Sequence, residues 1–171
     1  MKIMLNPGHG GIDPGAIGAN GTKETEINAE IAKVTAEHLR KAGHDVIVYQ
    51  QQKRLADVAE MANASGAALF VSIHCNSAVN RNAHGTECWH YTGCPTGKRF
   101  ATQIQLEIVK AIGTRDRGVK TSRSLYVLRK TTMPAVLIEA GFLSNPAEEK
   151  LLNAKTAEIG EAIAKGILAA M

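Results

Sequence analysis

Short apolar runs alternate along the chain with longer stretches in which apolar residues recur at helical spacing. A continuous apolar run of four to eight residues is typical of a buried strand, and strict alternation is typical of a half-buried one. Residues 85–91 alternate and predict an edge strand. In chain order, the runs predict strands at residues 2–5, 45–49, 68–74, 85–91, 125–129 and 135–139.

Helical spacing separates these runs. Ile27, Ile31, Val34 and His38 predict one helix, which Gly43 ends. Two further helices are predicted from the apolar residues between 55 and 62 and between 100 and 112. A last helical region begins at residues 145–148, where Asn, Pro and Glu occupy the positions they favour at a helix start, and continues to the C-terminus.

Strands that alternate with helices predict the α/β class. We expect a single domain over residues 1–171, with a twisted, mostly parallel sheet of about six strands and helices on both faces. The length of 171 residues suits one domain with a substantial core.

Composition changes this picture little. No apolar run approaches the roughly 20 residues that span a bilayer, so we expect no membrane insertion. The first residues lack a secretory signal, which implies release by another route, such as phage lysis, or a truncated chain. The net charge of +4 permits contact with an anionic polymer, although scattered basic residues are usually just solvated. Three cysteines without CxxC spacing indicate neither a zinc knuckle nor a disulfide framework, and we expect at least two of them to be small buried hydrophobic residues.

Candidate chemistry gathers where strands end, because open α/β sheets bind ligands at the carboxyl ends of their strands. His9 follows the first strand in the glycine-rich segment NPGHGG, and His74 ends the run ALFVSIH. Glu139 ends the run AVLIE, and Glu24 begins the first helix after the His9 loop. We expect these four residues to meet at one edge of the sheet.

Two histidines and a glutamate can bind zinc and leave a coordination position open for water, while a further carboxylate can accept the proton of that water. Each residue has a simpler interpretation. A lone histidine in a glycine loop is more often a turn residue, and a histidine at a strand end is as often structural as functional. Glu139 is harder to explain away, because a carboxylate is rarely buried without a partner. The convergence favours a metal site.

At these same residues the sequence resembles the zinc-dependent N-acetylmuramoyl-L-alanine amidases of the amidase 3 family, found in autolysins and phage endolysins. The segments NPGHGGIDPGAIG, KETEINAEIA, SIHCNSA and LYVLRKTTMPAVLIEAGFLSNPAEEKLL carry the resemblance, which spans essentially the whole chain. It implies His9, Glu24 and His74 as ligands of one Zn²⁺ and Glu139 as the catalytic carboxylate. The implied reaction cuts the amide bond between N-acetylmuramic acid and L-alanine in peptidoglycan, at the bacterial cell wall.

Three departures from the family pattern stand out. Asn6 occupies a position where members often carry Asp, so we expect His9 to lack that charged support. A threonine-arginine motif is replaced by QQQKR at residues 50–54, which predicts altered substrate contacts. The connection after His74 is about ten residues long, too short for the inhibitory helix of some cell-division amidases, and implies an open site.

Two other classes of function compete with the amidase. A module that binds metal or cell wall without catalysis would not need Glu139. A phosphate- or nucleotide-binding protein would use the glycines of the first loop, but neither GxxxxGK[ST] nor GxGxxG occurs there. We therefore expect peptidoglycan as the partner, with anionic wall polymers as a further candidate and no nucleic acid.

Overall fold

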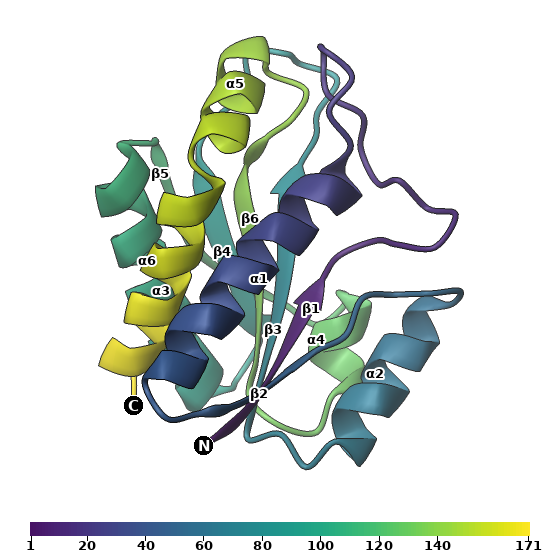
Figure 1. The fold of residues 1–171 in the computed structure, drawn as a ribbon, viewed down its shortest axis with the longest axis vertical. Coiled ribbons are helices and arrows are strands. Elements are labelled where there is room, and N and C mark those ends of the chain that lie inside the picture. Colours follow the sequence, from purple (N-terminus) through teal and green to yellow (C-terminus); the bar gives the residue numbers. More distant parts are fainter.

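The computed structural model describes residues 1–171, which form a six-stranded sheet with helices on both faces (Figure 1). The expected α/β class with a mostly parallel sheet is confirmed. The elements in chain order are β1 (Lys2–Pro7), α1 (Glu24–Lys41), β2 (Asp45–Val48), α2 (Leu55–Ala64), β3 (Leu69–Asn76), β4 (Thr86–Tyr91), α3 (Pro95–Ile112), β5 (Asp116–Ser122), α4 (Tyr126–Lys130), β6 (Ala135–Phe142), α5 (Pro146–Ala154) and α6 (Thr156–Ala169).

The strand order is β2-β1-β3-β6-β4-β5. Four of the five neighbouring pairs are parallel, and only β4 and β6 run antiparallel. Side chains alternate between the two faces of the sheet, so the register decides which of them meet. His74 on β3 pairs with Glu139 on β6, and Glu139 pairs in turn with Glu87 on β4.

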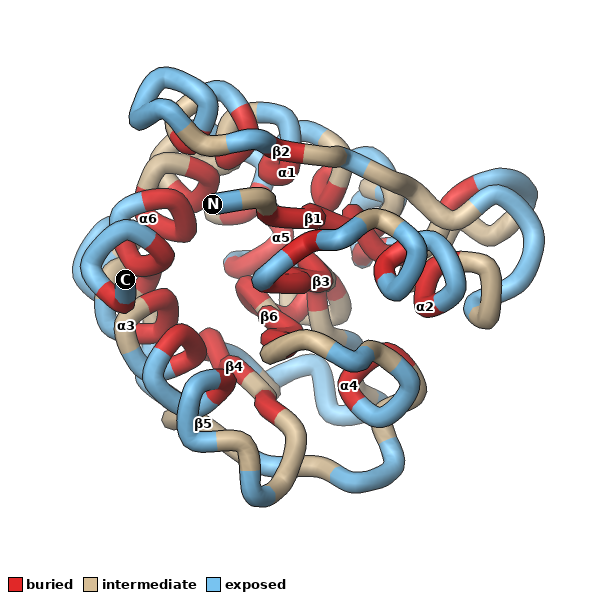
Figure 2. The backbone as a smooth tube through the Cα atoms, turned by 90° about the horizontal axis from the view of Figure 1, so that it is seen from below, coloured by how far each residue is buried: buried red, intermediate tan, exposed pale blue.

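The two faces carry cores of unequal size. Helices α1, α3 and α6 cover one face over a cluster of 28 buried residues, whereas α2 and α4 cover the other over nine (Figure 2). Odd-numbered residues of β3 from Leu69 to Cys75 belong to the larger core, and Phe70 belongs to the smaller. His74 therefore points toward the α2/α4 face, where the thinner cover leaves room for a cleft.

Two strand predictions are wrong. Residues 125–129 form most of helix α4 rather than a strand. A short apolar run cannot distinguish the two by periodicity. The hydroxyl of Ser122 accepts the amides of Ser124 and Leu125 and turns the chain into the helix, which buries the consecutive residues Val127 and Leu128.

The edge-strand prediction is the second error. Residues 85–91 contain β4, but β4 lies inside the sheet because β5 pairs along its outer side. The segment of β5 reads DRGVKTS, with charges and a glycine at φ 81°, and lacks the alternation that indicates a strand. The expected start of the last helical region and the expected burial of cysteines are both observed. Asn145 caps α5 by accepting two amides, and Cys75 and Cys88 are free and buried.

The connection from β3 to β4 contains no helix, as its length predicts. No helix of the structure is both long enough and apolar enough to cross a membrane.

The long loop between β1 and α1 is held against α5 by Glu149, which is 1% exposed. Its carboxylate accepts the backbone and side-chain amides of Asn20 and the backbone amide of Thr22, at 2.7–3.1 Å. Gly18 packs so closely that a Cβ there would collide with the same carboxylate. Burial opposes ionisation of Glu149, but these hydrogen bonds outweigh it and lower its pKa below the usual range.

We therefore predict that Glu149→Gln destabilises the fold by about 1–2 kcal/mol at pH 7, because it removes the charge from several hydrogen bonds. A lowered folded-state pKa contributes stability above the unfolded value of about 4.5, and that stability is lost as pH falls through the folded value. The difference between wild type and variant in urea unfolding should thus shrink between pH 7 and pH 3. Glu37→Gln, on the exposed side of α1, is the matched control and should change stability little at either pH. A pH-independent difference would show that the charge is not the cause.

Candidate metal centre and cleft

His9 begins the site, in the loop directly after β1. Its backbone lies at φ 63°, the only positive φ of a residue other than glycine. Such a conformation costs about 1–2 kcal/mol and is a recognised sign of a functional position. Its Nδ1 donates to Asp13 Oδ2 at 2.8 Å, and Asp13 Oδ1 accepts the amide of Gly15 at 3.0 Å. The imidazole is therefore held by a carboxylate of its own loop.

Glu24, the first residue of α1, lies beside His9 and is only 3% exposed. Oε2 lies 3.1 Å from His9 Nε2 and accepts the amide of Ala16, while Oε1 accepts the amide of Cys75 at 3.1 Å. The helix N-terminus stabilises the negative charge further. This carboxylate joins the loop, the helix and β3.

His74 completes the cluster from β3. Its Nδ1 lies 3.0 Å from Glu24 Oε1, and its ring meets that of His9 edge-on with centroids 5.0 Å apart. Gly8 is required here for space, because a Cβ at that position would overlap the His74 imidazole. The neighbouring thiol of Cys75 points into the larger core, where burial raises its pKa well above the usual range, so it offers no ligand.

Charge within the cluster is strongly coupled. Hydrogen bonding to Glu24, opposed by burial and assisted by Asp13, raises the pKa of His9 to about 9. Burial opposes ionisation of Glu24, yet its hydrogen bonds to His74 and His9 outweigh this effect and lower its pKa. The carboxylate is thus negative at neutral pH and attracts positive charge.

The three side chains can hold a metal ion. One donor atom from each of His9, Glu24 and His74 lies within 4.8 Å of the other two. Two imidazoles and a carboxylate form a donor set typical of catalytic zinc, and Asp13 supplies the carboxylate that commonly orients a ligating histidine. The residues present therefore fit such an ion.

Glu139 lies on β6, paired in register with His74. Its Oε2 is shielded from solvent and has no hydrogen-bond partner. Burial, followed by the negative charges of Glu24 and Glu87, raises the pKa of Glu139 to about 8. A shielded carboxyl group without a partner is costly in a fold, so its position calls for a functional explanation.

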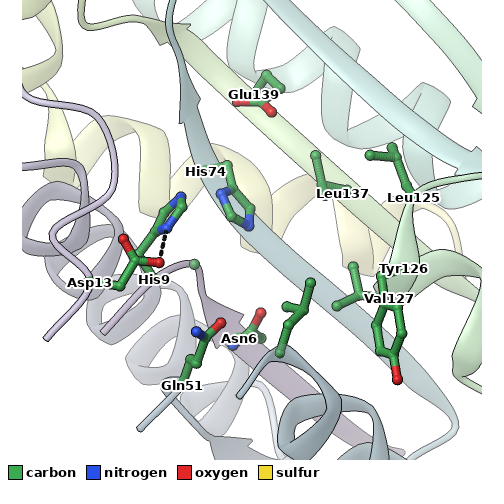
Figure 3. A pocket seen from close by; sticks show the side chains of 12 residues that line it. Asn6, His9, Asp13, Gln51, His74, Leu125, Tyr126, Val127, Leu137 and Glu139 are labelled. Carbon is green, nitrogen blue, oxygen red and sulfur yellow. Dashed lines mark hydrogen bonds and ion pairs between the residues drawn. The ribbon is translucent and has the colours of Figure 1, made fainter. Parts of the chain in front are cut away.

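These groups open onto a cleft of about 310 Å³ on the α2/α4 face (Figure 3). His9, His74 and Glu139 lie along the polar side of the cleft, and α4 supplies an apolar side. The apolar side chains that line it are Leu55, Leu125, Tyr126, Val127 and Leu137.

The structure thus brings His9, Glu24 and His74 together and places Glu139 on the adjacent strand. Asn6 lines the same cleft but makes no hydrogen bond to any of them. Its amide donates to the carbonyl of Tyr49 and its oxygen accepts the hydroxyl of Ser72, so it ties β1 to its neighbours. The expectation that His9 lacks charged support is wrong, because Asp13 provides it. Asp13 lies four residues after His9 in the same loop, a proximity that sequence analysis could have used.

Asn28 is a second supporting residue that the sequence did not reveal. It lies one turn after Glu24 on α1 and is fully buried. Its Nδ2 donates to Glu24 Oε1 at 3.3 Å and to the carbonyl of Gly8 at 3.2 Å. An asparagine within a helix gives no sequence signal for such a role.

Known proteins have the same fold and a similar sequence. The chain is 37% identical over 155 residues to the N-acetylmuramoyl-L-alanine amidase LytC of Bacillus subtilis, covering 88% of this chain and 31% of LytC, so it spans about a third of that relative's length. The structure of the amidase AmiC2 of Nostoc punctiforme superposes with a TM-score of 0.92 at 32% identity, covering 99% of this chain and 96% of that one. The catalytic domain of the CD27L endolysin, which targets Clostridia difficile, gives a TM-score of 0.84 at 27% identity, covering 99% and 97%.

A family model described as N-acetylmuramoyl-L-alanine amidase matches residues 3–169, nearly the whole chain. The resemblance inferred from the sequence motifs is confirmed. The chain belongs to the N-acetylmuramoyl-L-alanine amidase family, amidase 3.

Proposed function

We propose that residues 1–171 form a zinc-dependent catalytic domain that hydrolyses the amide bond between N-acetylmuramic acid and L-alanine in peptidoglycan. The observation that carries this proposal is the unpartnered carboxyl group of Glu139 beside the cluster of His9, Glu24 and His74. A cluster alone would serve a binding module equally well. The additional carboxyl group supplies the acid-base function that hydrolysis needs.

His9, Glu24 and His74 would hold one Zn²⁺ in this domain. When bound, zinc lowers the pKa of water toward about 7 and polarises a carbonyl group. Asp13 keeps His9 in the tautomer with its proton on Nδ1, which leaves Nε2 as the donor atom facing Glu24. Asn28 and the amides of Ala16 and Cys75 fix the carboxylate of Glu24.

Glu139 moves the proton. Its carboxylate accepts one proton from the attacking water while the water oxygen adds to the lactyl carbonyl carbon. As the carbon–nitrogen bond breaks, Glu139 returns that proton to the alanine nitrogen, which leaves as a free amine. No hydrogen-bond donor of the protein occupies Glu139 Oε2, so this oxygen is available to exchange a proton with water and substrate.

The substrate is a wall polymer, so we place the activity at the bacterial cell wall. The net charge of +4 would also favour contact with anionic wall polymers. Hydrolysis distinguishes this proposal from a binding module. Purified walls treated with the enzyme should gain N-terminal alanine, and a chelator should abolish that gain until zinc is added back.

We predict that Glu139→Gln retains one zinc per chain but loses about 10²- to 10⁴-fold in kcat, the usual contribution of an acid-base group. The amide preserves the shape of the side chain while removing its ability to take up a proton. Metal content by mass spectrometry and the release of N-terminal alanine from walls measure the two properties separately. Glu60→Gln, on the exposed surface of α2, is the matched control and should behave as wild type. Undiminished hydrolysis by Glu139→Gln would refute the role assigned to this residue.

We also predict that Asp13→Asn weakens zinc binding by about 10- to 100-fold, the usual effect of losing a carboxylate that orients a ligating histidine. Competition with a fluorescent chelator measures the affinity directly, without reference to activity. Asp45→Asn is the control, since Asp45 lies on the edge strand β2, is exposed, and pairs with Lys2 rather than with a residue of the metal cluster. Equal affinity in the two variants would show that Asp13 does not support His9.

A further inference from the structure

The polar row that begins at the metal cluster continues across the sheet to β5. Side chains that pair in register share a face, and three cross-strand pairs connect the row: His74 with Glu139, Glu139 with Glu87, and Trp89 with Lys120. The cations Arg117 and Lys120 of β5 reach Glu87 on this same face. Acidic and metal-binding groups thus occupy one end of the row, and cationic groups occupy the other.

A second groove, of about 300 Å³, follows this row. Its lining residues are Asn76, Glu87, Trp89, Ser122, Ser124, Leu125 and Glu139. Leu125 and Glu139 also line the first cleft, so the two hollows share a boundary. A substrate whose amide bond lies beside Glu139 can therefore extend from the first hollow into the second.

Glu87 lines this groove and is only 4% exposed. Arg117 Nε donates to its Oε2 at 2.7 Å and Lys120 Nζ donates at 2.5 Å, while Trp89 Nε1 donates to Oε1 at 3.2 Å. Burial opposes ionisation of Glu87, but Lys120 and Arg117 outweigh it and lower its pKa. One carboxylate therefore faces two cations, so these three side chains carry a net positive charge next to the groove that Glu87 lines.

The two cations differ in how far they are occupied. Arg117 also donates to the carbonyl of His84 at 3.3 Å, and its guanidinium stacks 4.8 Å from the ring centre of Phe142. Lys120 also lies over a ring, with Nζ 5.2 Å from the ring centre of Trp89. Its side chain is 34% exposed, against 27% for Arg117, and Glu87 accepts only one of its three N–H donors. Lys120 thus retains donors for a ligand.

Resting on the function proposed above, we propose that Lys120 binds a free carboxylate of the stem peptide, and that Glu87 is a positioning residue that holds the ammonium group at the groove. Strands lie about 4.8 Å apart, so β5 is about 10 Å from β6, where Glu139 acts. An extended peptide advances about 3.3–3.6 Å per residue. The carboxylate would then belong to the second or third residue of the stem, beyond the bond that is cut.

The experiment uses pairs of muropeptides that differ in a single group, a free carboxylate or the corresponding carboxamide, at the second or the third stem residue. For at least one pair, wild type should prefer the carboxylate by about 10- to 100-fold in kcat/KM, mostly through KM, as expected for a hydrogen bond to a charged group. Lys120→Gln should reduce that preference to about one, and Lys120→Arg should largely keep it. Lys98→Gln, which removes an exposed lysine on α3 over the opposite face, should leave the preference unchanged.

Two results would overturn the proposal. Wild type could fail to distinguish the members of either pair, or Lys120→Gln could weaken both members equally, as loss of a merely structural contact between β4 and β5 would do. Calorimetric binding of the same pairs to the zinc-loaded Glu139→Gln enzyme reads the charge preference without catalysis. Absence of hydrolysis by wild type would therefore count against the proposed function, whereas absence of a Lys120-dependent preference in binding would count against this inference alone.

Discussion

The structure depends most on one buried carboxylate, that of Glu24. An ionised carboxylate removed from water is costly unless every oxygen finds a partner. Here Oε1 meets His74, Asn28 and the amide of Cys75, and Oε2 meets His9 and the amide of Ala16. These partners come from the first loop, α1 and β3. Satisfying one charge therefore fixes the relative positions of three segments, and the same contacts place both imidazoles for a metal ion.

The distribution of charge across the α2/α4 face explains why Glu139 differs from its neighbours. Glu24 and Glu87 lie on either side of it. The negative charge of Glu24 is stabilised by hydrogen bonds to the two histidines of the cluster, and that of Glu87 by the two cations of β5. Glu139 has no such partner, and the two negative charges beside it raise its pKa together with burial. The hydrogen bonds of Glu24 and Glu87 thus fix both carboxylates in their charged form, whereas Glu139 has no such partner, which suits the proton exchange proposed for it.

Sequence reasoning predicted the parts of the fold that strong local patterns encode. The run ALFVSIH and the helix of Ile27 and Ile31 have a clear period, and both appear as expected. Strand β5 has no such pattern, because its segment DRGVKTS is polar and is held by pairing with β4 and by ion pairs to Glu87. Residues 125–129 do have an apolar pattern, but so short a run is compatible with a strand or a helix. The turn at Ser122 decides in favour of the helix. Tertiary contacts decide both cases.

The same distinction separates the site residues that the sequence revealed from those it did not. His9, His74 and Glu139 break local patterns, one as a histidine among glycines and two as polar ends of apolar runs, so each was visible in isolation. Asp13, Asn28 and Lys120 break no pattern, because an acidic loop residue, a helical asparagine and a lysine in a polar segment are all ordinary. Their roles arise only from what lies beside them in space. The groups proposed to carry out the chemistry can thus be found from sequence, and Asp13 could be found from its proximity to His9 in the same loop. The supporting contacts of Asn28 and the place of Lys120 beside Glu87 become apparent only from the folded structure.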